Sequence, residues 1–208
     1  MVASRSIGGD FSDYLEFDAT RVAFALGDVA GKGPPAALLA ALLLGSFRSS
    51  ARPDSTPSRV VAATNGMLVS HNREARFATL VHGVLSSDGT LTYCNAGHNP
   101  PILLRADSVE RLEEGGTIVG LFEYAEYEDK TVKLVDGDLV VVFSDGISEA
   151  ANREGTEFGD ERIRQTVEQH RNESTSTIAD AVISAVTSFA TGAPMYDDYS
   201  VMVVRYRG

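Results

Sequence analysis

The sequence predicts one mixed α+β domain, on three observations. The chain has 208 residues, about the length of one ordinary domain. Segments with strand periodicity and segments with helix periodicity follow each other as strand, two helices, several strands, two helices and a strand. Neither a repeat of fixed period nor a low-complexity linker divides the chain. We therefore expect a single domain over residues 1–208 with a core of its own.

The first part of the chain predicts a strand followed by two helices. Residues 21–29 form an apolar run that ends in Gly-Asp-Val, which is typical of a buried strand entering a turn. Two prolines after Gly33 suit the first turn of a helix, and leucines then recur at helical spacing, so a helix is expected over Pro34–Ser50. Thr56 before Pro57 has the pattern of an N-cap and a first helical proline, and predicts the second helix.

The middle of the chain changes to the short apolar runs of a sheet. Three such runs are Phe77–Leu85, Leu91–Cys94 and Ile102–Arg105. Ser-Ser-Asp-Gly-Thr joins the first two and predicts a hairpin. Two further runs, Glu128–Leu134 and Asp138–Phe143, flank Asp136-Gly137, and we expect them to pair as another hairpin.

The last third returns to helix and ends in a strand. Residues Asp160–His170 carry apolar side chains at helical spacing. Thr177 with Asp180 has the form of a capping box and predicts a further helix that reaches about Ala190. We expect Tyr199–Tyr206 to be the terminal strand.

Charge and composition argue against several classes of protein. The chain has 18 Lys and Arg against 29 Asp and Glu, a net charge of −11, which repels a phosphate backbone, so no nucleic-acid partner is expected. No apolar run reaches the roughly 18 residues of a membrane span, and the N-terminus lacks the apolar stretch of a signal peptide, so no membrane partner is expected. Cys94 is the single cysteine, which fits a small core residue in a cytoplasmic protein.

Several aspartates stand beside glycine or at the ends of apolar runs. They are Asp10, Asp28, Asp145, Asp197 and Asp198. Aspartate is a common turn former, so each one alone has an ordinary structural explanation. Together they suggest a shared site, because buried like charges need pairing or a cation, and only Lys32 lies close to one of them in sequence. Hard oxygen ligands without a His or Cys cluster favour Mg²⁺ or Mn²⁺ over zinc.

Another polar group lies in Asn-Ala-Gly-His-Asn-Pro-Pro, residues 95–101. His98 has the chemistry of a general base or a ligand, but it lacks a partner cluster. We therefore expect a structural role, in which the His98 ring and Asn99 bond the loop backbone. The glycines of residues 27–33 do not have the spacing of a nucleotide-binding phosphate loop, and no Gly-x-Ser-x-Gly elbow is present. Nucleotide binding and serine hydrolysis are therefore not supported.

Six segments follow one another along nearly the whole chain: Gly8-Gly-Asp-Phe-Ser-Asp13, Gly27-Asp-Val-Ala-Gly-Lys-Gly-Pro34 with Ala36-Ala-Leu38, Phe77-Ala-Thr-Leu80, Asn95-Ala-Gly-His98, Phe143-Ser-Asp-Gly-Ile-Ser-Glu-Ala150 and Asp197-Asp-Tyr-Ser200. Together they resemble the bacterial SpoIIE/RsbU branch of the metal-dependent (PPM, type 2C) serine/threonine phosphatases. The resemblance implies an αββα sandwich, in which two antiparallel sheets are flanked by helix pairs and hold metal ions at one end.

The resemblance also implies a site with two Mn²⁺ or Mg²⁺ ions. Asp28 would bridge the ions, the Val29 carbonyl would ligate one, and Asp145 and Asp197 the other. Asp10 would ligate an ion directly or hold metal-bound water. Asp28 and Asp145 would be catalytic through water that the two ions activate for attack on phosphorus. Three further acids are expected to support the turns: Asp13, Glu149 and Asp198.

The implied activity is that of a protein phosphatase in bacterial signal transduction. The expected substrate is a phosphoserine or phosphothreonine protein, namely a phosphorylated anti-anti-sigma (STAS-domain) factor of a partner-switching or stress-response pathway. Two alternatives stay open: a pseudophosphatase that binds metal weakly and acts as an interaction domain, and a hydrolase of small phosphoesters.

The sequence departs from the family pattern in three places. Ala30 stands where many eukaryotic members have a histidine, and Arg5 is the only arginine before Asp10 that could clamp phosphate. Such domains usually have a further strand before the first motif. We therefore expect that the chain lacks its first strand and an upstream sensor region or activator, which would act through the helix after Gly33.

Overall fold

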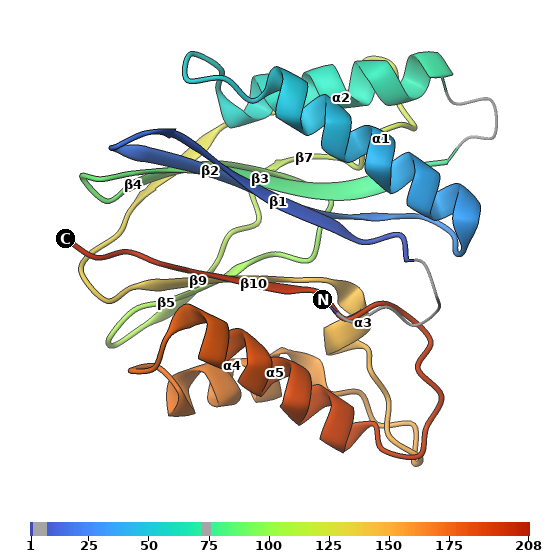
Figure 1. Cartoon of the computed structure of the whole chain (residues 1–208), viewed down its shortest axis with the longest axis vertical. Coiled ribbons are helices and arrows are strands. Elements are labelled where there is room, and N and C mark those ends of the chain that lie inside the picture. The colour runs from blue at the N-terminus through green and yellow to red at the C-terminus, as the bar shows by residue number, and fades with distance from the viewer. Residues whose placement is uncertain (2–7, 72–75) are drawn as a thin grey trace.

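The computed structural model describes residue 1, residues 8–71 and residues 76–208. Two β-sheets stack face to face, and a pair of helices covers the outer face of each sheet (Figure 1). The result is the four-layer αββα sandwich predicted from the sequence. None of the helices in this part of the chain is long and apolar enough to cross a membrane.

The first sheet has six strands and is built mainly from antiparallel neighbours. Its order is β1–β2–β3–β4–β7, and β8 also pairs with β4. Only the two-residue β7 runs parallel to its neighbour. The strands are β1 (Phe11–Asp18), β2 (Arg21–Val29), β3 (Ala78–Ser86), β4 (Thr90–Ala96), β7 (Gly115–Gly116) and β8 (Lys130–Lys133).

The second sheet has four strands in the order β10–β9–β5–β6. They are β5 (Ile102–Leu104), β6 (Val109–Arg111), β9 (Leu139–Phe143) and β10 (Val201–Arg205). The predicted hairpin around Asp136-Gly137 is wrong, because this turn carries the chain from β8 in the first sheet to β9 in the second. All five residues of β9 are buried, since one face meets helices and the other meets the opposite sheet, and such a strand takes a central position.

Two helices pack on each sheet (Figure 1), and a short helix follows β9. They are α1 (Pro34–Ser50) and α2 (Pro57–His71) on the first sheet, α4 (Gly159–Gln169) and α5 (Thr175–Phe189) on the second, and α3 (Asp145–Ser148) after β9. Helix α1 has the predicted bounds. Helix α5 begins earlier than the predicted capping box, because Ser174 is its N-cap and accepts a 3.1 Å hydrogen bond from the Thr177 amide.

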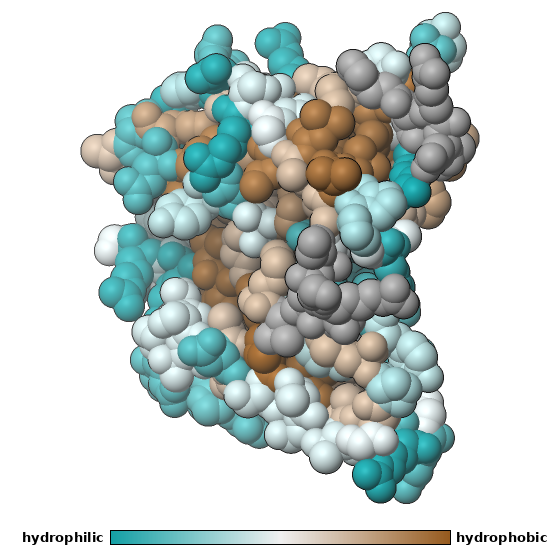
Figure 2. Space-filling model, turned by 45° about the vertical axis from the view of Figure 1, so that its right-hand side comes forward, coloured by the Kyte–Doolittle hydropathy of each residue, from teal (hydrophilic) through white to brown (hydrophobic). Residues whose placement is uncertain are grey.

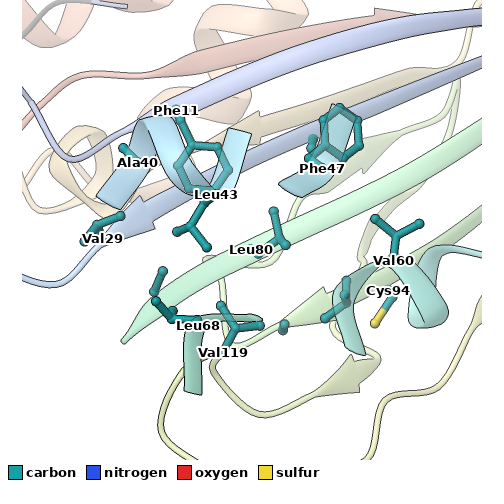
Figure 3. Packing of buried hydrophobic residues seen from close by; sticks show 14 of the residues in the cluster. Phe11, Val29, Ala40, Leu43, Phe47, Val60, Leu68, Leu80, Cys94 and Val119 are labelled. Carbon is teal, nitrogen blue, oxygen red and sulfur yellow. The ribbon is translucent and has the colours of Figure 1, made fainter. Parts of the chain in front are cut away.

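Three apolar layers hold these elements together. One lies between α1, α2 and the first sheet and includes Phe11, Leu43, Phe47, Leu80 and Cys94 (Figure 3). The second lies between the two sheets, and the third lies under α4 and α5. Full burial of one such aliphatic side chain contributes about 1.5–3 kcal/mol, so the sheets form a rigid base for the loops at their ends. Cys94 is completely buried, as expected of a small core residue.

Helix α1 also exposes apolar side chains to solvent. Leu38 is 73% exposed and Leu42 is 46% exposed. Figure 2 shows hydrophobic surface in the upper part of the molecule, the layer that contains α1 and α2 in Figure 1. Single exposed leucines are common, but two on neighbouring helical turns form an apolar stripe next to the loop that follows β2.

Candidate active site

Four segments that are distant in the sequence converge at one edge of the sandwich. The start of β1, the end of β2, helix α3 and the chain before β10 meet at the right-hand side of Figure 1. In the first sheet Phe11 pairs with Gly27, so Asp10 and Asp28 extend from the same end of neighbouring strands. In the second sheet Val201 pairs with Phe143, which places the chain before β10 beside the start of α3. The stacked sheets therefore bring together the aspartates that the sequence singled out.

Asp10 and Asp28 form the buried part of this acidic group. Asp10 is 9% exposed, and its Oδ2 atom has no hydrogen-bond partner among the described residues. Burial raises the pKa of both carboxyls. The negative charge of Asp10 raises the pKa of Asp28 further, and Asp145 and Asp197 add to the effect. A group whose charged form is disfavoured by burial and by like charges is one that a cation would stabilise.

Gly9 packs closely against the end of β2 that carries Asp28 and Val29. A Cβ atom placed on Gly9 would lie 2.9 Å from the Val29 carbonyl oxygen and 3.1 Å from Asp28 Oδ1. These two oxygens therefore lie close to one another, against a residue without a side chain. Glycine is required at position 9 for this close approach. Together, the carbonyl and the carboxylate offer two hard donors at the end of β2.

Asp145 and Asp197 face this pair from the second sheet. Burial raises the pKa of Asp145, and the charge of Asp197 adds to the effect. Asp197 accepts a 2.9 Å hydrogen bond at Oδ1 from the Asp198 amide, and its Oδ2 lies 2.9 Å from Lys32 Nζ. A Cβ atom on Gly146 would lie 3.1 Å from the Asp197 Cβ, so the chain before β10 packs directly on α3.

Two serines hold that chain in place. Ser144 Oγ donates a 3.1 Å hydrogen bond to the Asp198 carbonyl and accepts one of 3.1 Å from the Ser200 amide. Asp198 itself is 4% exposed. The chain that follows Asp197 is therefore held by hydrogen bonds to Ser144.

The other two supporting acids lie in different surroundings. Asp13 Oδ2 lies 2.5 Å from Arg48 Nε, which ties β1 to α1. Glu149 lines a pocket of about 330 Å³ at the site, and the pKa of its carboxyl is raised, first by burial and then by Asp145. Asp28, Asp145 and Thr79 line the same pocket. Two larger hollows, of about 480 and 520 Å³, lie along β1, β2 and β10, away from these aspartates.

The donor set fits Mg²⁺ or Mn²⁺ in its chemistry. It contains carboxylate oxygens, one of them the unpartnered Asp10 Oδ2, and a backbone carbonyl, which are the ligands that hard cations prefer. In the described part of the chain, no three His, Cys, Asp or Glu side chains are gathered tightly enough to hold an ion as they stand.

The loop that contains His98 is held differently from our prediction. Asn95 is the residue that bonds the loop backbone: its amide donates to the carbonyls of His98 and Leu112, both at 3.1 Å, and its oxygen accepts the His98 amide at 2.8 Å. The Asn99 side chain instead donates to Ser148 Oγ at 2.9 Å. The His98 Nδ1 atom lies 2.8 Å from the Thr79 hydroxyl, and burial lowers the pKa of the ring to about 4. His98 is thus a buried neutral ring at the back of the pocket.

Ala30 and Arg5 are the residues at which the sequence departs from the family pattern. The Ala30 amide donates to the Phe77 carbonyl at 2.9 Å and helps to close the loop after β2. The methyl side chain of Ala30 has no ionisable group, so it cannot serve as a general acid. Arg5 lies outside the described residues.

Known proteins with the same arrangement point to one family. The phosphoserine phosphatase RsbU of Bacillus subtilis (strain 168) is 25% identical over 208 residues, which cover 98% of this chain and 61% of RsbU. The chain also matches Protein IcfG of Synechocystis sp., with 27% identity over 97% of this chain and 36% of IcfG. It therefore spans 61% of the length of RsbU and 36% of the length of IcfG. The stretch shared with each is therefore one part of a longer protein.

Solved structures show the same fold at low sequence identity. The PP2C domain of SiaA from Pseudomonas aeruginosa superposes with a TM-score of 0.88 at 20% identity, over 99% of this chain and 83% of that one. RsbX, solved in complex with magnesium, superposes with a TM-score of 0.72 at 16% identity, over 98% of this chain and 90% of its own. The family model described as Stage II sporulation protein E (SpoIIE) matches residues 18–207. The chain therefore belongs to the SpoIIE family and has the fold of its PP2C phosphatase domains, as the sequence motifs indicated.

Proposed function

We propose that this chain is a metal-dependent protein phosphatase that hydrolyses phosphoserine or phosphothreonine with the help of two Mn²⁺ or Mg²⁺ ions. The observation that carries the proposal is the meeting of Asp28, Asp145 and Asp197 from separate strand ends at one edge of the sandwich, with the pKa of Asp28 raised by burial and by the other acids. Such an edge repels a phosphate dianion unless cations neutralise it. Membership of the SpoIIE family and the 25% identity to a phosphoserine phosphatase support this assignment.

Each residue has a defined task in this proposal. Asp28 would contribute to both ions, the Val29 carbonyl would help to hold one of them, and Asp145 and Asp197 would help to hold the other. Asp10, buried beside Asp28, holds water or completes the ligand set. A pair of divalent ions at such a site lowers the pKa of water and stabilises the charge that develops on phosphoryl oxygens. The protein's own contribution is to fix these donors at one edge of the two stacked sheets.

We further propose a phosphorylated STAS-domain anti-anti-sigma protein as the substrate, in a partner-switching or stress-response pathway of the bacterial cytoplasm. The relationship to RsbU supports this choice, and the single buried Cys94 fits a reducing compartment. The pocket of about 330 Å³ has room for a phosphorylated side chain, while the rest of a protein substrate would lie on the surrounding surface. Neither nucleic acid nor a membrane has a part in this proposal.

A sensor region or activator upstream of the chain is the proposed regulator. The apolar stripe of Leu38 and Leu42 on α1 supports a partner there, because the helix begins directly after the loop that follows Asp28. A small shift of α1 would move Asp28 and Val29 relative to Asp145. We therefore expect the isolated chain to be weakly active.

The experiment compares turnover of a phosphoserine protein with that of para-nitrophenyl phosphate, in EDTA, Mg²⁺ and Mn²⁺. We expect EDTA to abolish turnover and Mn²⁺ to restore it, with preference for the protein substrate. Full activity in thoroughly chelated protein would contradict the metal requirement. Preference for the small ester would favour a phosphoesterase, and metal binding without turnover of either substrate would favour a pseudophosphatase.

A further inference from the structure

Lys32 places a positive charge against the acidic edge. It lies in the loop between β2 and α1, and its Nζ reaches the chain before β10, 2.9 Å from Asp197 Oδ2. The same ammonium donates a hydrogen bond to the Tyr196 carbonyl. Lys32, in the loop that follows β2 of the first sheet, thus holds the chain before β10 of the second sheet, which carries the proposed ligand Asp197.

The loop is built to present this side chain. Lys32 lies between Gly31 and Gly33, whose φ angles of 110° and 79° belong to the left-handed region that favours glycine. The two glycines therefore let the backbone turn on either side of Lys32.

We propose that Lys32 is an internal counter-ion that occupies Asp197 in the metal-free protein and must be displaced when a divalent ion binds there. This inference rests on the proposed function, because it takes Asp197 to be a metal ligand. An ammonium and a dication repel each other at the distance that separates two partners of one carboxylate. The ion pair is about 40% exposed on each side, so it is weak enough to exchange. Lys32 thereby sets the metal concentration at which the site fills.

The test is Mn²⁺ binding to the whole chain, measured by calorimetry and by the electron paramagnetic resonance signal of free Mn²⁺. Lys32→Gln removes the charge, and Lys32→Arg keeps it. Lys130→Gln is the matched control, because Lys130 pairs with Glu114 at 3.2 Å and is half-exposed at a different place in the fold. We expect the Mn²⁺ Kd of Lys32→Gln to be about three- to tenfold lower than that of the wild type, while both other variants stay at the wild-type value.

Three further readouts do not depend on activity. Without metal, Lys32→Gln should melt at a lower temperature than the wild type, because the acidic edge has lost its counter-ion. Its rise in melting temperature on adding Mn²⁺ should be larger. High salt screens the ion pair and should shrink the difference in Kd between Lys32→Gln and wild type.

Two patterns of binding overturn the inference, and they differ in what they say of the metal centre. Equal or weaker Mn²⁺ binding by Lys32→Gln, with normal binding by the wild type, shows that Lys32 only shapes the loop and leaves the proposed function standing. Absence of saturable binding in every variant overturns both the Lys32 role and the metal centre. Binding by Lys32→Gln alone supports competition in its strongest form.

Discussion

The two ends of the β1–β2 hairpin carry the same residue type in opposite electrostatic states. At the open end, burial and neighbouring carboxylates raise the pKa of Asp10 and Asp28. At the turn, Asp18 accepts hydrogen bonds from the Thr20 hydroxyl at 2.6 Å, from Arg21 Nε at 3.0 Å and from the Thr20 amide at 2.9 Å, and these contacts lower its pKa. The open end therefore concentrates negative charge, whereas at the turn the charge of Asp18 is neutralised by Arg21, three residues further along the chain.

The difference separates residues placed for function from residues placed for folding. The β3–β4 turn has the same arrangement as the β1–β2 turn, an aspartate that is hydrogen-bonded and paired with a basic residue. Asp88 accepts a 2.8 Å hydrogen bond from the Thr90 amide and lies 3.3 Å from Lys133 Nζ. Carboxylates satisfied in this way fix a turn and need nothing from outside. At the open end, the pKa values of Asp10 and Asp28 are raised, Asp10 Oδ2 has no hydrogen-bond partner among the described residues, and Asp197 pairs with Lys32 from a distant loop. Burying these charges costs free energy, and a bound cation would offset that cost.

Asp28→Asn should have the largest effect of any single substitution. The amide has one good acceptor and no charge, so it cannot hold two dications together, and we expect turnover to fall by roughly three orders of magnitude or more, at about 1.4 kcal/mol per tenfold. Stability without metal should hold or rise, because one charge leaves a crowded acidic group. Turnover, Mn²⁺ titration and circular-dichroism melting measure the three effects. Near-normal turnover by folded Asp28→Asn protein would refute the metal-centre assignment.

Asp197→Asn and Asp198→Asn separate the two neighbouring acids before β10. Asp197 faces Asp145 and Lys32, whereas Asp198 is buried and its carbonyl is bonded by Ser144. We expect Asp197→Asn to weaken Mn²⁺ binding by about tenfold or more, and Asp198→Asn to change it less. Calorimetric titration of both variants gives the order. A larger loss for Asp198→Asn would show that the second aspartate is the ligand.

Gly9→Ala should have a smaller effect on the same end of the hairpin. The added methyl would meet the Val29 carbonyl oxygen at 2.9 Å and Asp28 Oδ1 at 3.1 Å, so both donors must shift by a few tenths of an ångström. We expect Mn²⁺ affinity to fall several-fold while the protein stays folded. Gly45→Ala in α1 is the matched control, because a Cβ atom there meets nothing within 4 Å and should stabilise the helix by about 0.5–1 kcal/mol. Unchanged metal affinity in Gly9→Ala would show that the two oxygens are not ligands.

The sequence predicted elements with clear local signals and failed where pairing is set by distant contacts. Strand β2 and helix α1 have the predicted bounds, because glycine and proline mark both ends of strongly apolar segments. Strand β1 was not predicted, because its serine, aspartates and glutamate suit an edge strand and weaken the alternation. Strands β8 and β9 were wrongly paired, because a turn signal does not tell in which sheet the next strand lies.

For the candidate site, the sequence predicted which residues belong to it but not the contacts that bring them together. Positions beside glycine and at the ends of apolar runs singled out Asp28, Asp145 and Asp197, and the family resemblance suggested a role for each. The structure brings them to one edge through sheet stacking, for which no short segment of sequence carries a signal. The contact of Lys32 with Asp197 joins residues far apart in the chain, so the sequence could show only that a lysine follows the Asp28 loop. The role of Asn95 was missed for another reason: any of the polar residues in its loop could have bonded the backbone, and only the structure distinguishes them.

Asp18→Asn should have the smallest effect and should act on stability alone. Asparagine keeps an acceptor for the Thr20 amide and loses the ionic contact with Arg21, an exposed pair, so we expect the melting temperature at neutral pH to fall by a few degrees at most, with metal affinity and turnover unchanged. The sign with pH follows from the lowered pKa of Asp18 in the folded protein. The unfolded chain takes up this proton first as the pH falls, so the stabilisation is complete above the ordinary pKa of 3.8 and is lost below it. The melting temperatures of wild type and Asp18→Asn should therefore differ at pH 7 and converge in acid, and a difference that persists in strong acid would mean that Asp18 acts through packing and not through its charge.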